Sequence, residues 1–209
     1  MDADEVELRV LGCLVEKQRT TPDVYPLSLN ALRLACNQTT NRDPVVAYDE
    51  PTIRAGLERL SRKGWTRLAS GAGSRAAKYR HLLDDALGLS AAELSILAVL
   101  MLRGPQTPGE LKQRSERLHP LGSLEEVESV LGGLIERDLV AQLGRRPGQK
   151  EARYGHLLGE EKPVSGPPAS ASLSQGSSFD DRVATLERRV ERLEAALAAL
   201  EADLSRRGS

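Results

Sequence analysis

The histidines and cysteines are the side chains best suited to acid–base or metal chemistry in this chain. The three histidines are His81, His119 and His156, and two of these, His81 and His156, each lie two residues after a tyrosine. This shared context predicts a common packing or hydrogen-bonding role at the ends of two strands. Cys13 and Cys36 lack the spacing of a metal-binding pair and lie in apolar helical patterns, which favours buried thiols.

Other patterns typical of catalysis or cofactor binding are weak. Gly71-Ala-Gly73 lacks the Lys-Ser/Thr pair of a phosphate-binding loop, and no set of histidine, cysteine and carboxylate residues has metal-ligand spacing. Asn37, Asn41, Arg42 and Asp43 are the best candidates for a small-ligand site, although a loop network that satisfies its own polar groups is favoured. We therefore expect no enzymatic activity, no cofactor and no metal.

The elements that must position these residues occur twice along the chain. The segment 11–22 returns as 97–108, and 78–83 returns as 153–158. A unit of roughly 80 residues is long enough to bury a core of its own. The duplication therefore predicts two related domains, residues 1–88 and 89–160, with about eleven extra residues in the polar segment 37–48 of the first copy.

Hydrophobic periodicity and turn residues predict the same element order in both copies. In the first copy, helices are expected near 5–17, 28–36 and 50–63, and strands near 65–69 and 76–82. In the second copy, the expected helices are 90–102, 107–118 and 123–137, and the expected strands are 139–143 and 151–157. Three helices and a two-stranded wing predict tandem winged helix-turn-helix domains, a mainly α fold with small β-hairpin wings.

Several longer motifs resemble the bacterial YceH family. They are Leu11-Gly-Cys-Leu-Val-Glu-Lys17, the segments 21–32 and 35–38, Asn41-Arg-Asp-Pro44, the segment 102–111 and Pro147-Gly-Gln-Lys-Glu151. The resemblance covers roughly residues 5–160. It implies a tandem winged-helix fold, and it implies little about activity because the family is associated with no established function or ligand.

The C-terminal part has a different composition. Residues 161–179 are rich in Pro, Ser, Gly and Ala, which predicts a flexible linker. Residues 180–206 place apolar side chains at alternating spacings of three and four, which predicts a C-terminal coiled-coil helix and a homodimer. The seam residues are Val183, Leu186, Val190, Leu193, Leu197, Leu200 and Leu204. A single amphipathic helix docked on its own domain is the alternative, and membrane-surface binding is disfavoured by the interspersed glutamates.

The charge pattern decides whether such domains can bind double-stranded DNA. The chain has 29 Lys and Arg against 30 Asp and Glu, so DNA contact requires a local basic patch. With Ile53, Leu57 and Leu60 inward, the third helix of the first copy is expected to present Thr52, Ala55, Glu58, Arg59 and Arg62 outward. The candidate DNA contacts are Arg54, Arg59, Arg62, Lys63, Arg67, Arg75, Lys78, Arg80, Arg145, Arg146, Lys150 and Arg153.

The second copy points to a different partner. With Val127, Leu131 and Leu134 inward, its third helix is expected to present Glu125, Glu126, Ser129, Gly133 and Glu136 outward. Carboxylates at these positions would repel phosphates, so this face suits a protein partner better. We therefore expect a DNA-binding or chromatin-associated regulator, with a dimeric protein-interaction scaffold as the alternative. The acidic N-terminus and the lack of a long apolar run predict a cytoplasmic location without membrane association.

Overall fold

The computed structural model describes residues 3–69, 77–144 and 151–159. The chain divides into two units, residues 1–168 and 169–209, and all described residues belong to the first. The predicted linker at 161–179 and the predicted coiled coil at 180–206 lie outside the described residues. So do four of the candidate DNA contacts, namely Arg75, Arg145, Arg146 and Lys150.

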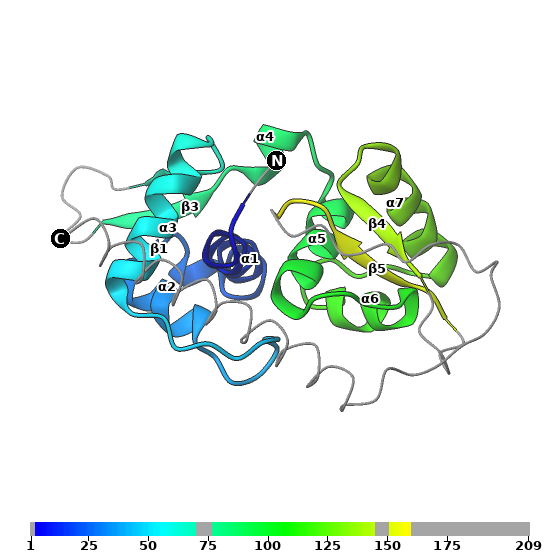
Figure 1. Ribbon diagram of the computed structural model, residues 1–209, viewed down its shortest axis with the longest axis horizontal. Coiled ribbons are helices and arrows are strands. Elements are labelled where there is room, and N and C mark those ends of the chain that lie inside the picture. The colour runs from blue at the N-terminus through cyan, green and yellow to red at the C-terminus, as the bar shows by residue number, and fades with distance from the viewer. Residues whose placement is uncertain (1–2, 70–76, 145–150, 160–209) are drawn as a thin grey trace, which may run out of the picture. The chain divides into compact units, whose positions relative to one another are not determined.

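The first half of the described body combines helices with a small antiparallel sheet (Figure 1). Its elements are α1 (Glu5–Thr20), a 3-10 turn (Pro22–Val24), β1 (Leu27–Ser28), α2 (Leu29–Cys36), α3 (Glu50–Arg62), β2 (Thr66–Leu68), β3 (Lys78–His81) and α4 (Leu83–Leu87). The strand order is β1-β3-β2, with Leu27 opposite Tyr79 and Leu68 also opposite Tyr79 on the other side. β3 is therefore the central strand.

The second half repeats the three helices and the final strand pair, without counterparts of the 3-10 turn, β1 and α4 among the described residues. Its elements are α5 (Ala91–Arg103), α6 (Pro108–Ser115), α7 (Leu124–Glu136), β4 (Val140–Leu143) and β5 (Arg153–His156). The two strands pair antiparallel, with Val140 opposite His156 and Leu143 opposite Arg153. The described residues thus form a mainly α fold with small antiparallel sheets, as predicted.

Local capping interactions explain where several helices begin. Asp4 accepts a hydrogen bond from the Glu7 backbone N–H, and the Glu7 side chain accepts one from the Asp4 N–H. The same reciprocal pattern joins Ser90 with Glu93. Each pair satisfies two backbone donors that the first helical turn leaves without a partner. Thr107 and Glu110 form a third such box, at the start of α6.

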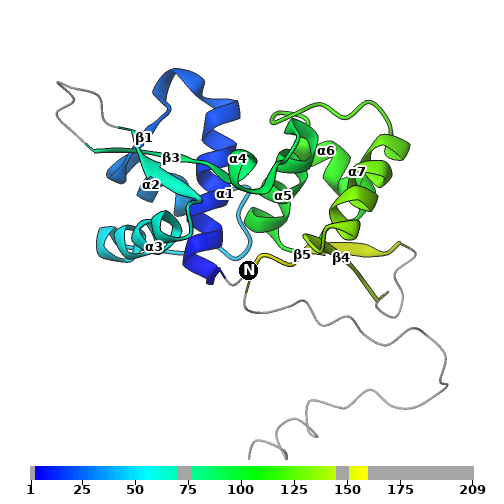
Figure 2. The same cartoon turned by 90° about the horizontal axis from the view of Figure 1, so that it is seen from above.

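The core is centred on α1 and α5, which pack directly against each other (Figure 2). Nine consecutive residues are buried in α1, Glu7–Val15, and nine in α5, Leu94–Leu102. A Cβ atom on Gly12 would lie 2.9 Å from Leu102 Cγ, so glycine permits this close approach. The sequence predicted one apolar face for α1, whereas burial extends around the helix because α5 covers a second face.

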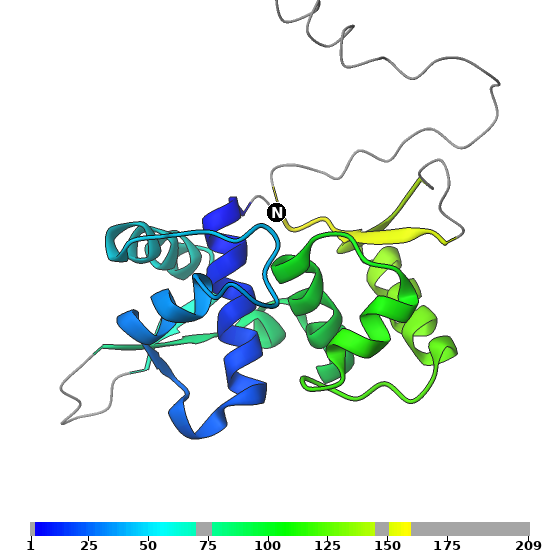
Figure 3. The same ribbon diagram turned by 90° about the horizontal axis from the view of Figure 1, so that it is seen from below.

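The polar segment between α2 and α3 links the two halves. It runs from Asn37 to Asp49 and curves toward the second half, as Figure 3 shows in blue against green. The Asp43 N–H donates a 2.9 Å hydrogen bond to the Leu102 carbonyl at the end of α5. Among the described residues, no helix is long and apolar enough to cross a membrane.

Candidate functional site

Helix α3 presents a charged face to solvent. Asp49 caps the helix through the Thr52 N–H, and Ile53, Leu57 and Leu60 are buried as predicted. The exposed side chains are Arg54, Glu58, Ser61 and Arg62 on one flank, whereas Thr52, Ala55 and Arg59 are half-buried. The exposed face is therefore rotated from the predicted one. The physical reason is the close approach of α1, because a Cβ atom on Gly56 would lie only 3.0 Å from Val6 Cγ1.

A recess separates this face of α3 from the neighbouring strands. It has a volume of ≈ 230 Å³ and is lined by Arg54, Leu57, Glu58, Ser61, Thr66, Arg67, Leu68 and Tyr79. Arg67 and Leu68 project from β2 and are exposed, with Leu68 at 58%. Arg54, Arg62 and Arg67 hold no ion pair among the described residues. Of the predicted DNA contacts, Arg54 and Arg67 thus line one recess, and Arg62 is exposed on the same helix, α3.

Two other predicted contacts, Arg59 on α3 and Lys63 just after it, pair with carboxylates instead. Arg59 Nη2 lies 2.6 Å from Asp4 Oδ2, and Lys63 Nζ lies 2.8 Å from Glu7 Oε1. Lys63 also lies over the ring of Trp65, 5.9 Å from its centroid. Both cations therefore hold α3 against the start of α1, and Asp4 and Glu7 largely neutralise their charges.

The remaining described candidates lie on the strands. Lys78 and Arg80 are half-buried on β3. Arg153, on β5, donates hydrogen bonds to Glu110 at 2.9 Å and 3.4 Å and to the Pro105 carbonyl at 2.8 Å. Arg153 therefore serves the contact between β5 and α6, away from the three exposed arginines of the first half.

The corresponding face of α7 is acidic. Val127, Leu131 and Leu134 are buried as predicted. Glu125, Glu126, Ser129 and Glu136 are exposed, and Gly133 is half-buried. Glu126 accepts a 2.7 Å hydrogen bond from the Gly122 N–H, which closes the turn before the helix. The exposed part of this face thus carries negative charge, whereas the face of α3 carries both arginines and glutamates.

His81 and His156 occupy equivalent positions at the ends of β3 and β5, but their contacts differ. His81 Nδ1 accepts a hydrogen bond from the Leu83 N–H, so Nε2 carries the proton that it donates to Gln18 Oε1 at 2.6 Å. Burial lowers the pKa of His81 to about 4, despite the opposing charge of Asp84. Burial also lowers the pKa of His156 to about 4. His156 Nδ1 has no hydrogen-bond partner among the described residues.

Cys13 and Cys36 are both buried and free, as the sequence predicted. A hydrogen bond with Cys13, together with burial, raises the pKa of Cys36. Among the residues that the structure describes, no three His, Cys, Asp or Glu side chains are placed to hold a metal ion.

The four candidate ligand residues of the long loop have different environments: Asn37 and Arg42 bond within the fold, whereas Asn41 and Asp43 are exposed. The side chain of Asn37 donates to the Tyr48 carbonyl at 2.8 Å and accepts from the Tyr48 N–H at 2.9 Å, which is the predicted loop network. Arg42 is buried and binds both oxygens of Glu16, at 3.1 Å and 2.6 Å. Burial opposes ionisation of Glu16, but the hydrogen bonds and charge of Arg42 hold its pKa below the usual value. Asn41 and Asp43 are exposed instead.

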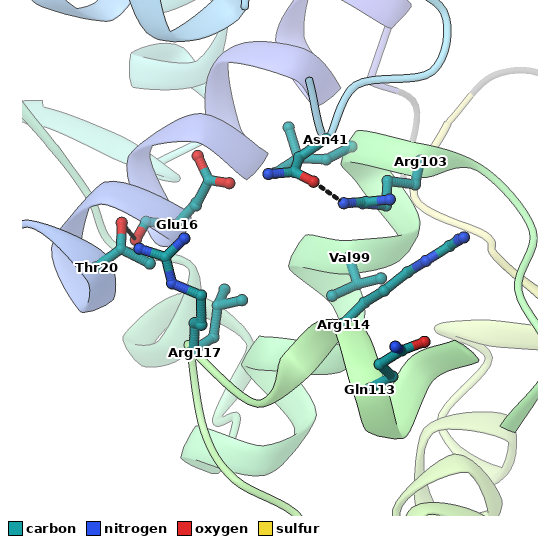
Figure 4. Close-up of a pocket in the computed structure, with 10 residues that line it drawn as sticks. Glu16, Thr20, Asn41, Val99, Arg103, Gln113, Arg114 and Arg117 are labelled. Atoms are coloured by element: carbon teal, nitrogen blue, oxygen red, sulfur yellow. Dashed lines mark hydrogen bonds between the residues drawn. The ribbon is translucent and has the colours of Figure 1, made fainter. Parts of the chain in front are cut away.

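The loop and the second half enclose two adjoining recesses that the sequence did not predict. The first, of ≈ 410 Å³, is lined by Glu16, Thr20, Asn41, Val99, Leu102, Arg103, Gln113, Arg114, Arg117 and Leu118. The second, of ≈ 590 Å³, is lined by Asn41, Arg42, Asp43, Pro44, Arg103, Gly104, Pro105, Gln106, Glu110, Arg114 and Arg153. Figure 4 shows Arg103 extending toward Asn41 and Arg117 extending toward Thr20. The signal in the sequence was the candidate small-ligand set on the extra loop, of which Asn41, Arg42 and Asp43 line the second recess and Asn37 lines neither.

Comparison with known proteins gives the family. A family described as "Protein of unknown function, DUF480" matches residues 3–149. The chain belongs to this family, which is also called UPF0502 and is YceH-like. The YceH resemblance predicted from the motifs is confirmed, and the matched region contains α3, the long loop and nearly all of the residues that line both recesses.

Relatives that carry the UPF0502 name match along almost the whole chain. A protein of Pelobacter propionicus is 48% identical, covering 96% of this chain and 94% of the relative. One of Geobacter sulfurreducens is 49% identical, covering 91% and 89%. One of Serratia proteamaculans is 45% identical, covering 93% of each. These UPF0502 names state no activity, so function rests on the residues themselves.

Proposed function

We propose that this chain is a non-enzymatic DNA-binding protein whose two halves are winged helix-turn-helix units. The element order supports this fold, because three helices followed by an antiparallel strand pair occur in each half. In such units the third helix enters the major groove and the strand pair lies against the backbone. On this basis α3 is the recognition helix, and β2 with β3 forms the wing beside it.

The observation that carries the proposal is the set of exposed arginines on α3 and β2. Arg54 and Arg62 lie two helical turns apart on one flank of α3, and Arg67 lies on the adjoining strand. All three are exposed and hold no ion pair among the described residues. Arg62 donates one long hydrogen bond, from Nε to the Glu58 carbonyl at 3.5 Å. The three guanidinium groups can therefore contact phosphates without first breaking an ion pair.

The same surface limits how tightly one chain can bind. Glu50 and Glu58 alternate with Arg54 and Arg62 at four-residue spacing along α3, so the helix face has no net charge. If three arginines each neutralise one phosphate, log Kd changes by about 3 for each tenfold change in salt. A homodimer formed through Val183–Leu204 would raise the effective concentration of the second site and strengthen binding. We therefore expect weak binding that depends strongly on salt.

The test is fluorescence anisotropy of a labelled random-sequence duplex, at low and at near-physiological salt. Arg54→Glu combined with Arg62→Glu should abolish binding to the duplex. The matched control is Arg19→Glu with Lys112→Glu, which makes the same change of charge on α1 and α6 and should bind almost as the unaltered chain does. Absence of binding at low salt, or equal loss in both variants, would overturn the proposal.

A protein-interaction scaffold is the second candidate, and the face of α7 favours it. Glu125, Glu126, Glu128 and Glu136 are exposed on this helix and would repel a phosphate backbone. This acidic face of α7 is instead complementary in charge to a basic surface on a protein partner. If the duplex fails to bind, Glu128→Lys with Glu136→Lys becomes the variant to compare in partner-capture experiments.

A further inference from the structure

We propose that the recess between the long loop and helices α5 and α6 binds a small ligand that carries a phosphate or similar oxyanion. The site comprises Asn41 on the loop, Arg103 at the end of α5, Arg114 on α6 and Arg117 just beyond it. Figure 4 shows these side chains around one opening, together with Glu16 and Thr20 of α1. The ligand would contact both halves of the body at once.

Arginines outnumber carboxylates around the site. The two adjoining recesses share Asn41, Arg103 and Arg114. Their combined lining has more arginines than carboxylates: Arg42, Arg103, Arg114, Arg117 and Arg153 against Glu16, Asp43 and Glu110. Burial, followed by the charges of Arg114 and Arg42, lowers the pKa of Arg103 below its usual value. An anion placed among these guanidinium groups would relieve that repulsion.

Glu16 and Glu110, two of the three carboxylates, already have partners within the fold. Glu16 is bound on both oxygens by Arg42 and lies 3.2 Å from Lys17. Glu110 caps α6 and pairs with Arg153 at 2.9 Å, which leaves Arg114 at a longer 3.6 Å. Arg103 donates to the Asn41 side chain, a neutral partner. Arg117 is exposed and has no ion pair among the described residues. Arg117 can therefore bind an anion directly, whereas Arg103 would exchange a neutral partner and Arg114 one long ion pair for the anion.

The volume and lining of the recess suit a small molecule. Its volume of ≈ 410 Å³ falls in the range of about 300–1,000 Å³ that is typical of small-molecule sites. Val99, Leu102 and Leu118 supply an apolar wall beside the arginines. A pocket with an apolar wall and convergent cations suits a phosphorylated compound, whose charged group the arginines would bind bidentately.

The test uses inorganic pyrophosphate as the probe and the full-length chain. Isothermal titration calorimetry and thermal unfolding are measured at constant ionic strength, with NaCl replacing the probe in the reference series. We expect binding and a Tm that rises with pyrophosphate concentration, because a ligand held by the folded state alone stabilises it. Arg114→Gln with Arg117→Gln should weaken the binding at least tenfold.

Control variants separate this site from the proposed DNA surface. Arg54→Gln with Arg62→Gln removes the same number of charges from α3 and should bind pyrophosphate as the unaltered chain does. Circular dichroism establishes that each variant is folded before titration. No binding at millimolar pyrophosphate, or equal weakening in both pairs of variants, would overturn the proposal. Loss of duplex binding alone would leave it intact, since the two surfaces share no residue.

Discussion

The internal contacts of individual arginines decide which of them are available to a partner. Arg59 pairs with Asp4 and Arg153 pairs with Glu110, so both stabilise contacts between distant segments of the chain. Arg54 and Arg62 have no such partner among the described residues. The sequence predicted all four as candidate DNA contacts, with Arg59 and Arg62 on the outward face of the third helix. It could not show which of them are paired, because the partner carboxylates lie more than forty residues away in sequence.

The two strand-end histidines should make stability depend on pH below neutrality. His81 and His156 have pKa values of about 4 in the folded chain, against an ordinary value of 6.5. Between pH 6.5 and about 4 the unfolded chain therefore binds more protons, and the free energy of unfolding falls as pH falls. Each histidine contributes a slope of up to about 1.4 kcal/mol per pH unit.

Urea unfolding at pH 7, 6 and 5 measures this slope. His81→Gln and His156→Gln should each reduce the slope between pH 6.5 and 5, even where they lower stability at pH 7 by removing buried contacts. Well above pH 7 the two histidines are neutral in both states, so their contribution to the slope should vanish. Slopes that are identical in all three proteins would contradict the assigned pKa values.

At the scale of elements, the close contact between α1 and α5 depends on a glycine. A Cβ atom on Gly12 would meet Leu102 Cγ at 2.9 Å and Met101 Cβ at 3.3 Å. Gly12→Ala should therefore force the two helices apart and destabilise the fold by about 1–3 kcal/mol, as overpacking does elsewhere. The change in urea midpoint measures this effect.

Gly132 provides the matched control for that substitution. It lies within α7, and a Cβ atom there would meet nothing within 4 Å. Gly132→Ala should instead stabilise the fold by about 0.5–1 kcal/mol, because alanine loses less conformational freedom in a helix. If both substitutions were stabilising, α1 and α5 would have to pack less closely than described.

The long amphipathic helices were predictable because their periodicity and capping residues agree. The prediction for α3 began and ended within one residue of the observed Glu50–Arg62, as Pro51 and Gly64 indicated. β1 and α4 were not predicted. β1 has only two residues, too few to show alternation, and it exists because Leu27 and Ser28 pair with Tyr79 and Lys78. Tertiary pairing of this kind leaves no local pattern.

For the whole molecule, the burial of α1 and α5 ties the two halves together. The sequence predicted two domains because the chain repeats, yet the repeat does not show how the copies pack. Nine consecutive buried residues in each helix mean that neither α1 nor α5 faces solvent over its central turns. The recess around Arg103 was unpredictable for the same reason, since it forms only where the two copies meet.

Separating the halves should therefore unfold them. A fragment of residues 1–88 would expose the side of α1 that α5 covers, and a fragment of 89–160 would expose the matching side of α5. We expect each fragment to be largely unfolded or aggregated, and residues 1–160 together to unfold in one cooperative transition. Circular dichroism and size-exclusion chromatography measure both. Two stable, monomeric fragments would contradict this expectation.

The packing of α1 against α5 also sets an order of events during synthesis. α1 ends at Thr20 and α5 ends at Arg103, so the ribosome must add more than eighty residues before the partner helix is complete. At ordinary rates of translation this delay is on the order of 10 s, far longer than helix formation itself. Throughout that interval α1 keeps one apolar side uncovered. This N-terminal helix is therefore the segment of the nascent chain on which we expect chaperones to act first.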